Sequence, residues 1–365
     1  MDLATSAWFP SIAGLLAGIV MGFAARRQHF CTMSALERHW YASDSNGLRT
    51  WVLAAAVATI GTQALHFAGY ADIDSSFYLS EHFAWSGAII GGVAFGFGMA
   101  LVGTCGFGAL VRVGGGSLRS FVVLIVLGLS ALAAQRGLIA YGRISLVDNI
   151  TADLTFAGDQ SIGSVLSGLA GIDLRIPVAI LVPAAMLWWI FRSPQYRRNF
   201  GGIAAGSVIG GVITFGWFAT TLASHHAFEP VGVKSASFVA PVGDAILQIV
   251  TFTGVLPDYG VGLIVGIVMG AGLCAWQRRD LRWEACDDAR ELSRHLMGGF
   301  LMGTGGIFAM GCTIGQGVTA MSALALSAPL VMASIALGAR MGLAYLVEGT
   351  PFSIFRPTFR FRSTG

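Results

Sequence analysis

The chain has 365 residues, of which 55% are hydrophobic and only 11% are charged, and its formal net charge is +3. Soluble domains carry charge on about 25% of their residues, so this composition excludes a protein with a water-facing surface of ordinary size. Apolar runs recur from end to end, and about 20 apolar residues in a helix cross the ~30 Å hydrocarbon layer of a membrane. The sequence therefore predicts an all-α polytopic membrane protein.

Nine apolar stretches are long enough to be transmembrane helices. In chain order they are roughly 8–25, 51–69, 86–104, 118–135, 176–191, 200–222, 259–277, 295–311 and 325–347. No small-residue cleavage site follows the first stretch, so we interpret it as a retained helix and not as a signal peptide. Between the spans, Ser161–Ile172 and Val239–Val255 are candidates for short or re-entrant helices, with ordinary surface loops as the alternative.

The basic residues are distributed unevenly between the two sides that these spans define. With the N-terminus outside, the inner segments hold seventeen arginines, whereas the outer segments hold three arginines and Lys234. The outer segment 70–85 carries three acidic residues and no basic one. Basic residues favour the cytoplasmic side, so we expect an outer N-terminus and a cytoplasmic C-terminus.

A glycine and cysteine pattern occurs twice. An offset of 207 residues aligns Gly91, Gly92, Gly96, Gly98, Cys105, Gly108 and Ser120 with Gly298, Gly299, Gly303, Gly305, Cys312, Gly315 and Ser327, and a different offset of 248 aligns Gly18–Gly22 with Gly266–Gly270. The span before Cys105 is expected to run inwards and the span before Cys312 outwards, which makes the pattern an inverted-topology repeat. Transporters use such repeats to place a site between broken helices near the midplane.

This repeat suggests a division of the single membrane domain 1–365. Residues 8–135 form the first repeat, and residues 259–350 form the core of the second. Residues 136–258 are expected to be connecting spans with possible re-entrant segments.

Three cysteines follow apolar spans at points where a helix can break. They lie in Phe30-Cys31-Thr32, in Gly103-Thr104-Cys105-Gly106-Phe107-Gly108 and in Gly311-Cys312-Thr313-Ile314-Gly315-Gln316-Gly317. A helix that starts there has unpaired N–H groups that favour an anion, and a thiol is a weak donor that can contact sulfur or oxygen. The alternative is that each cysteine is a small buried hydrophobe, which is our interpretation of Cys274 and Cys286.

The candidate substrate-binding residues surround these breaks: Cys31, Cys105, Gly106, Gly108, Cys312, Thr313, Gly315 and Gln316. We expect no catalytic residue, cofactor or metal site. Five cysteines without a CxxC pair argue against a thioredoxin-type or zinc-ribbon motif, and no phosphate-binding loop, nucleophile elbow or nucleic-acid-binding pattern is present. Arg340 lies within the last apolar span, where it is either functional or a partner for a helix end or for Glu348.

These motifs, in their order and separation, resemble those of the YeeE/YedE family of sulfur-transport membrane proteins. The resemblance implies nine spans with short inserted helices, an inverted repeat with an hourglass-like waist, and a location in the bacterial inner membrane. It also implies that Cys31, Cys105 and Cys312 contact thiosulfate in succession. Some relatives are associated with selenium handling or with a small sulfurtransferase partner of the TusA type.

The leading hypothesis is therefore a permease that imports thiosulfate or a related inorganic sulfur anion, and not an enzyme. One alternative is a membrane thiol enzyme that relays sulfane sulfur or redox equivalents, and another is a transporter of selenium compounds. A purely structural subunit would leave the repeated glycine and cysteine motifs without a role.

Overall fold

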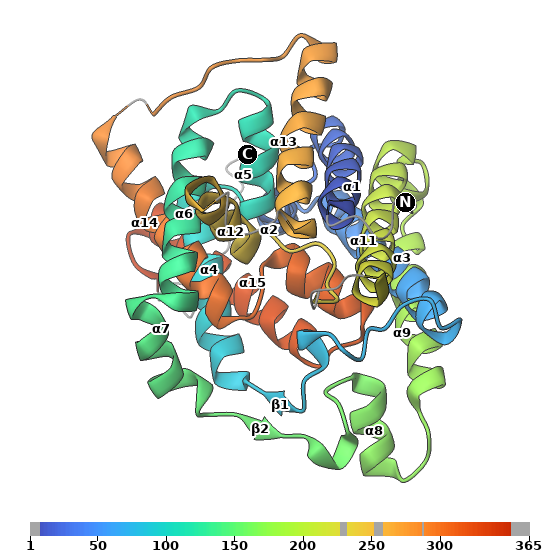
Figure 1. Cartoon of the computed structure of the whole chain (residues 1–365). Coiled ribbons are helices and arrows are strands. Elements are labelled where there is room, and N and C mark those ends of the chain that lie inside the picture. Colours follow the sequence, from blue (N-terminus) through green and yellow to red (C-terminus); the bar gives the residue numbers. More distant parts are fainter. Residues whose placement is uncertain (1–7, 227–231, 252–257, 287, 352–365) are drawn as a thin grey trace.

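The computed structural model describes residues 8–226, 232–251, 258–286 and 288–351. The described part is built of helices and one pair of two-residue strands, arranged around a central region of short helices (Figure 1). The tail residues Arg356, Arg360 and Arg362, and the end of the predicted segment Val239–Val255, lie outside the described residues.

A long helix forms at every predicted span. These helices are α1 (Phe9–Arg27), α3 (Asn46–Phe67), α4 (Trp85–Val102), α6 (Leu118–Arg136), α9 (Arg175–Phe191), α11 (Phe200–His226), α13 (Tyr259–Arg278), α14 (Ala289–Phe308) and α15 (Ser327–Glu348). Seven helical stretches, which contain all of these except α9 and α14, are long and apolar enough to cross a membrane. Helix α9 has only 17 residues, and α14 begins with charged turns. The prediction of an all-α polytopic membrane protein is confirmed.

Shorter elements connect or interrupt the long helices. They are α2 (Thr32–Tyr41), α5 (Gly106–Gly114), α7 (Leu138–Arg143), α8 (Ile162–Ala170), α10 (Pro194–Arg197), α12 (Val239–Val250), β1 (His82–Phe83), β2 (Ala152–Asp153) and single turns at Phe77–Leu79, Ile144–Asp148, Thr155–Ala157 and Gly315–Ala320. The strands pair antiparallel, with His82 opposite Asp153. The predicted short helices are present as α8 and α12, and the loop alternative is wrong for both.

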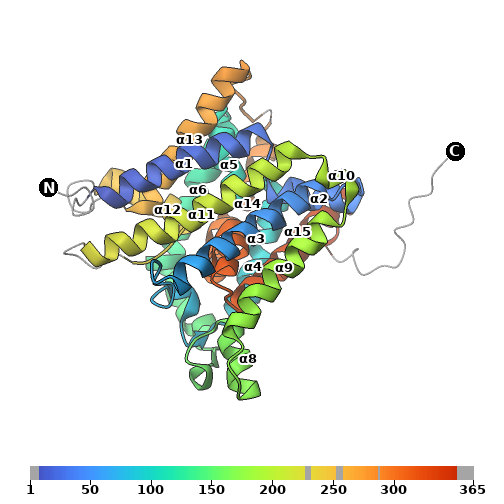
Figure 2. The same ribbon diagram turned by 90° about the vertical axis from the view of Figure 1, so that its right-hand side faces the viewer.

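One row of long helices runs in the order α13, α1, α11, α3 and α9 (Figure 2). Glycines allow the closest pair, α1 and α13, to touch through their backbones: a Cβ added to Gly14 would lie 2.1 Å from the Tyr259 carbonyl oxygen, and one added to Gly22 would lie 2.3 Å from that of Ile267. Small residues allow such close approach of membrane helices. The contacts advance together along both helices, so α1 and α13 run in the same direction. The sequence match between Gly18–Gly22 and Gly266–Gly270 is therefore a packing match between parallel helices and not an inverted one.

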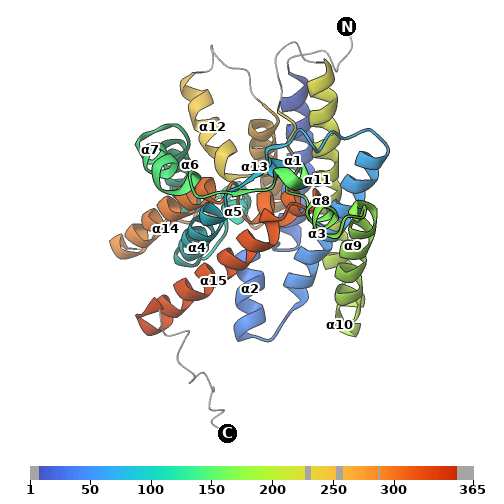
Figure 3. The same cartoon turned by 90° about the horizontal axis from the view of Figure 1, so that it is seen from below.

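The other row contains α6, α14, α4 and α15 (Figure 3). A Cβ added to Gly91 would lie 2.5 Å from the Gly305 carbonyl oxygen, and one added to Gly98 would lie 2.6 Å from that of Gly298. Helices α4 and α14 therefore cross in opposite directions. These four glycines belong to the pattern that repeats after 207 residues, in which Gly91 corresponds to Gly298 and Gly98 to Gly305. Gly91 contacts the counterpart of Gly98, and Gly98 contacts the counterpart of Gly91. A two-fold axis between the helices produces such reciprocal contacts.

Candidate functional site

The three predicted cysteines all lie where a short helical segment starts. Cys31 and Cys105 are the residues directly before α2 and α5, and Cys312 lies three residues before the turn Gly315–Ala320. The Cys105 sulfur accepts a hydrogen bond from the Gly108 N–H at 3.3 Å, and the Cys312 sulfur accepts one from the Gly315 N–H, also at 3.3 Å. Two equivalent thiols thus cap two equivalent helix breaks.

The backbone before each of these breaks adopts a left-handed conformation. Gly103 has a φ of 74° and ends α4, and Met310, its counterpart in the repeated pattern, has a φ of 55°. Glycine adopts this conformation freely, whereas for methionine it is strained. Gly311, with a φ of 158°, follows Met310 and leads directly to Cys312.

Cys31 and Cys105 lie together although they are far apart in sequence. Their sulfur atoms are 3.9 Å apart, and the Cys31 sulfur is also 3.6 Å from Thr104 Oγ1. The space around them depends on Gly108, because a Cβ there would lie 2.3 Å from Thr104 Oγ1 and 3.1 Å from the Cys31 sulfur. Gly106 has no such role in packing, since its added Cβ would meet only Leu127 Cδ1, at 3.6 Å.

A cavity of about 270 Å³ reaches Cys31, and we call it the Cys31 cavity. It lies at the end of α1 and the start of α11. Its lining residues include Gln28, His29, Phe30, Cys31, Arg38, Asp44, Asn46, Trp51, Asn199 and Gly202. Most of these belong to the arginine-containing segments 26–50 and 192–199.

A second cavity, of about 420 Å³, reaches the backbone beside Cys312, and we call it the Tyr78 cavity. Its lining residues include Phe77, Tyr78, Gln135, Arg143, Lys234, Ser235, Ser237, Asp244, Gly260, Met310 and Gly311. Gly260 lies at the start of α13, whereas Gln28 of the Cys31 cavity follows the end of the parallel helix α1. The two cavities therefore approach the centre from opposite ends of the helix bundle.

The cations of the Tyr78 cavity have carboxylate partners. Lys234 forms an ion pair with Asp258, and Arg143 Nε donates to Asp148 Oδ2 at 3.1 Å. Burial raises the pKa of Asp258, just before the α13 span, but the Lys234 ammonium and the backbone N–H groups of Val261 and Gly260 outweigh it and hold this pKa below its usual range. An anion that enters the cavity thus meets two cations, Lys234 and Arg143, whose positive charge is already balanced by a neighbouring carboxylate.

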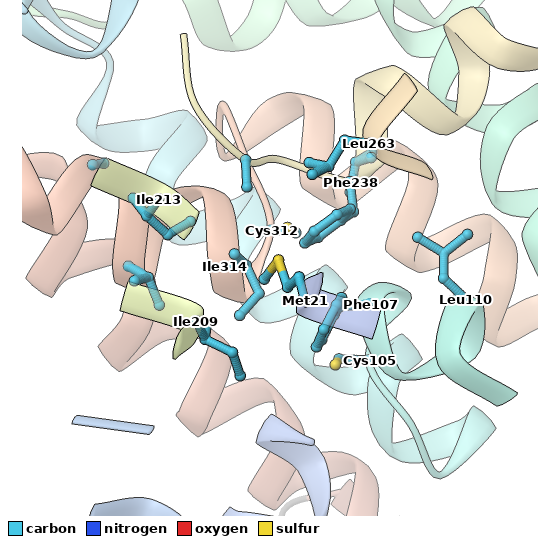
Figure 4. Close-up of a cluster of buried hydrophobic side chains, with 14 of the residues drawn as sticks. Met21, Cys105, Phe107, Leu110, Ile209, Ile213, Phe238, Leu263, Cys312 and Ile314 are labelled. Carbon is cyan, nitrogen blue, oxygen red and sulfur yellow. The ribbon is translucent and has the colours of Figure 1, made fainter. Parts of the chain in front are cut away.

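A buried aromatic pair lies between the two cavities. The rings of Phe107 and Phe238 stack with their centroids 5.0 Å apart, and Phe30, which lines the Cys31 cavity, meets Phe107 edge-on at 6.2 Å. Figure 4 shows Phe238 beside Cys312 and Phe107 beside Cys105, with Met21 next to them. Both rings are at most 1% exposed. The thiols are thus grouped with Cys31 and Cys105 on one side of the pair and Cys312 on the other.

The remaining predicted residues lie next to Cys312 but differ in what they contact. Gln316 is fully buried, its Nε2 donates to the carbonyl oxygens of Ala309 and Met310, and its Oε1 accepts from Ser327 Oγ. Thr313 is 1% exposed, and its hydroxyl has no hydrogen-bond partner among the described residues. The position of Gly315 leaves no room for a side chain, because an added Cβ would lie 2.8 Å from Ser237 Oγ.

Several residues at the site carry no signal in the sequence. Tyr78 and Ser237 come from segments that we read only as loops or short helices, and Phe238 directly precedes α12. Phe107 lies between Gly106 and Gly108, which were both predicted to bind substrate, and this neighbourhood is the sequence signal that pointed to the site. All five cysteines are free thiols, and Cys274 is buried within α13, while Arg340 is exposed on α15.

A helical membrane protein in which two cavities approach a buried constriction between broken helices has the architecture of a transporter. The chain belongs to the sulphur-transport family, whose model matches residues 27–341. This match confirms the resemblance drawn from the cysteine motifs, and the family's role is transport and not catalysis.

Two relatives are similar to the chain over most of its length. The thiosulfate transporter TsuA of Spirochaeta thermophila is 27% identical over 335 residues, which cover 89% of this chain and 96% of the relative. The thiosulfate transporter TsuA of Escherichia coli is 25% identical over 320 residues, which cover 84% of this chain and 86% of the relative.

Proposed function

We propose that this protein is a permease that imports thiosulfate, or a closely related inorganic sulfur anion, along a path that contains Cys31, Cys105 and Cys312. The observation that carries the proposal is the position of these thiols at helix breaks between two cavities on opposite sides of the bundle. The names of both relatives, thiosulfate transporters, support thiosulfate as the substrate.

The hydrogen bonds of the thiols suit weak, transient binding of an anion. The sulfur atoms of Cys105 and Cys312 each accept a backbone N–H, so the S–H hydrogen of Cys312 is left to donate to an anion, while that of Cys105 can be shared with the Cys31 sulfur 3.9 Å away. A thiol is a weak donor without a fixed charge, and conduction requires binding that is favourable enough for entry and weak enough for release. The N-terminal ends of the short helices add a favourable potential for negative charge.

The other site residues support this path in different ways. Gly106 contributes a backbone N–H at the start of α5, Gly108 and Gly315 leave room beside the thiols, and the Thr313 hydroxyl is available as a further donor. Gln316 holds the segment around Cys312 in place through its bonds to Ala309 and Met310.

Uptake of labelled thiosulfate into proteoliposomes tests the proposal. We expect the double variant Cys105→Ala/Cys312→Ala to lose at least about tenfold in initial rate, because each lost donor of this kind is worth about 1 kcal/mol. Cys274→Ala is the matched control, since Cys274 is also a buried cysteine but lies within α13. Undiminished uptake by the double variant would overturn the proposed path.

The alternatives are separated by two further measurements. A thiol enzyme would leave a persulfide or a mixed disulfide on Cys31, Cys105 or Cys312 after exposure to thiosulfate, which intact-protein mass spectrometry detects. A permease delivers the unmodified anion and leaves the thiols unchanged. Competition of selenite, selenate, sulfite and sulfate with labelled thiosulfate separates a sulfur transporter from a selenium transporter.

We further propose that the protein lies in a bacterial inner membrane with its N-terminus outside and its C-terminus in the cytoplasm. The excess of arginine on the side of the Cys31 cavity supports this orientation. It would make the Cys31 cavity the exit, where a small sulfurtransferase of the TusA type could receive the anion. Labelling of terminal tags in intact cells tests the orientation, and co-purification with such a carrier tests the partner.

The division of the chain into residues 8–135, 136–258 and 259–350 also remains our proposal. The reciprocal contacts of Gly91 with Gly305 and of Gly98 with Gly298 support a two-fold relation between the repeats.

A further inference from the structure

We propose that Phe107 and Phe238 form an aromatic gate that selects for weakly hydrated anions and closes the path between Cys312 and the Cys31–Cys105 pair. The inference rests on the proposed function, because it assigns the selectivity of the same path. It concerns two residues that line neither cavity and that lie between them.

The position of the pair makes it the barrier between the two cavities. Phe238 follows Ser237 and precedes Val239, both of which line the Tyr78 cavity. Phe107 is contacted edge-on by Phe30, which lines the Cys31 cavity. The stacked rings therefore join the end of one cavity to the end of the other, and an ion that passes between the cavities must part them.

Ser237 takes the place at Gly315 that Cys31 takes at Gly108: an added Cβ would lie 2.8 Å from Ser237 Oγ at the first position and 3.1 Å from the Cys31 sulfur at the second, so Phe238 corresponds to Thr32. Cys31 directly precedes α2, and the Thr32 backbone N–H, in the first turn of α2, contacts the Cys105 sulfur. Phe238 directly precedes α12, and its backbone N–H contacts the Cys312 sulfur. The same arrangement thus presents a thiol, from Cys31, beside Gly108 and a hydroxyl, from Ser237, beside Gly315, and the residue that follows is Thr32 in one case and the aromatic Phe238 in the other, which makes the path asymmetric.

The surroundings give each ring a limited freedom to move. Phe107 stands between Gly106 and Gly108, and the added Cβ of Gly106 would meet only Leu127 Cδ1, at 3.6 Å. Phe238 lies between the irregular residues 232–237 and α12. Both rings belong to short segments outside the long helices, so the opening that we propose involves α5 and the start of α12.

An aromatic constriction discriminates anions by the cost of removing their water. Hydrophobic constrictions exclude ions by dewetting, and desolvation of a charge without compensating hydrogen bonds is costly. Thiosulfate carries part of its charge on a large, polarisable terminal sulfur and is held less tightly by water than sulfate is. The positive edges of the rings also favour a soft sulfur end over a fully hydrated oxyanion.

The test compares thiosulfate and sulfate uptake by proteoliposomes that contain the full chain. For Phe107→Ala and for Phe238→Ala we expect sulfate uptake to rise and the thiosulfate-to-sulfate ratio of initial rates to fall at least about tenfold. Phe200→Ala is the control, because Phe200 is 78% exposed at the start of α11. An unchanged ratio in both gate variants, with thiosulfate uptake intact, would overturn the gate.

Volume-conserving variants keep the proposal testable if the alanine variants do not fold. Phe107→Leu and Phe238→Leu fill the space without an aromatic ring, and we expect the ratio to fall at least about threefold in folded protein. A ratio equal to that of the wild type would contradict an aromatic gate. Failure of the proposed function looks different: the wild type would then take up no thiosulfate, whereas sulfate leakage through Phe238→Ala above the wild-type level would still support the gate.

Discussion

The sulfur atom of Cys31 lies 3.9 Å from the sulfur atom of Cys105, although 74 positions separate them in the chain. A disulfide needs the two atoms to approach to about 2.05 Å, and this pair of thiols starts within about 2 Å of that distance. We therefore expect diamide, a two-electron thiol oxidant, to remove both thiol hydrogens and to join Cys31 to Cys105. The bond would hold these thiols away from the anion and stop uptake.

Peptide mapping by mass spectrometry checks this prediction. The Cys31–Cys105 peptide should be the dominant disulfide, and dithiothreitol should restore uptake. Cys31→Ser should abolish both the linkage and the inhibition by diamide. A linkage that involves Cys312 instead would contradict the grouping of the thiols on two sides of Phe107 and Phe238.

Two glycines of the same motif should respond differently to alanine. Gly108→Ala places a methyl group 2.3 Å from Thr104 Oγ1 and 3.1 Å from the Cys31 sulfur, so it forces the thiol pair apart. Gly106→Ala meets only Leu127 Cδ1 at ordinary contact distance. We expect thiosulfate uptake to fall at least about tenfold in Gly108→Ala, as overpacking costs about 1–3 kcal/mol, and to stay within about twofold of the wild type in Gly106→Ala. Equal losses in both variants would argue that these positions act through the backbone alone.

Thr313→Val separates a binding role from a structural role. The Thr313 hydroxyl is buried and has no hydrogen-bond partner in the described part of the chain, and replacement of such a group by a methyl is neutral or stabilising by about 1 kcal/mol. We expect the thermal midpoint of the purified protein in detergent to stay equal or to rise, while the apparent KM for thiosulfate rises. An unchanged KM would remove Thr313 from the path.

Gln316→Ala should show the opposite pattern in stability. It removes the donor to the carbonyl oxygens of Ala309 and Met310 and the acceptor of Ser327 Oγ, all in a buried segment. Each buried group left unpaired costs about 1–3 kcal/mol, so the thermal midpoint should fall clearly. A variant with wild-type stability and poor uptake would instead indicate direct contact of Gln316 with the anion.

Adjacent glycines of α11 test the helix packing away from the path. A Cβ on Gly210 would lie 2.6 Å from the Ala54 carbonyl oxygen, whereas one on Gly211 would have no atom within 4 Å. We expect Gly210→Ala to be destabilising by about 1–3 kcal/mol. Gly211→Ala should be neutral or stabilising by about 0.5–1 kcal/mol, since alanine favours helix. Thermal unfolding of both proteins in the same detergent makes the comparison, and similar midpoints would contradict the packing of α11 on α3.

Apolar length, arginine distribution and repeated motifs were enough to predict the class of protein from the sequence. Each predicted span became a helix because helix formation is the local way to satisfy backbone hydrogen bonds in lipid. The equivalence of Cys105 and Cys312 was also visible, since both lie in the same short motif. Their identical bonds to Gly108 and Gly315 follow from a spacing of three residues that any helix start imposes.

Only the tertiary structure decided which of these local features meet. Cys31 joins Cys105 and not Cys312, and Ser237 takes the corresponding place beside Gly315, because the helix rows bring together segments far apart in the sequence. The same packing decides that position 108 has no room for a side chain, whereas position 106 has room for a methyl group. Hydrophobic periodicity and motif spacing describe one segment at a time, whereas these contacts depend on how two glycine-faced helices approach each other.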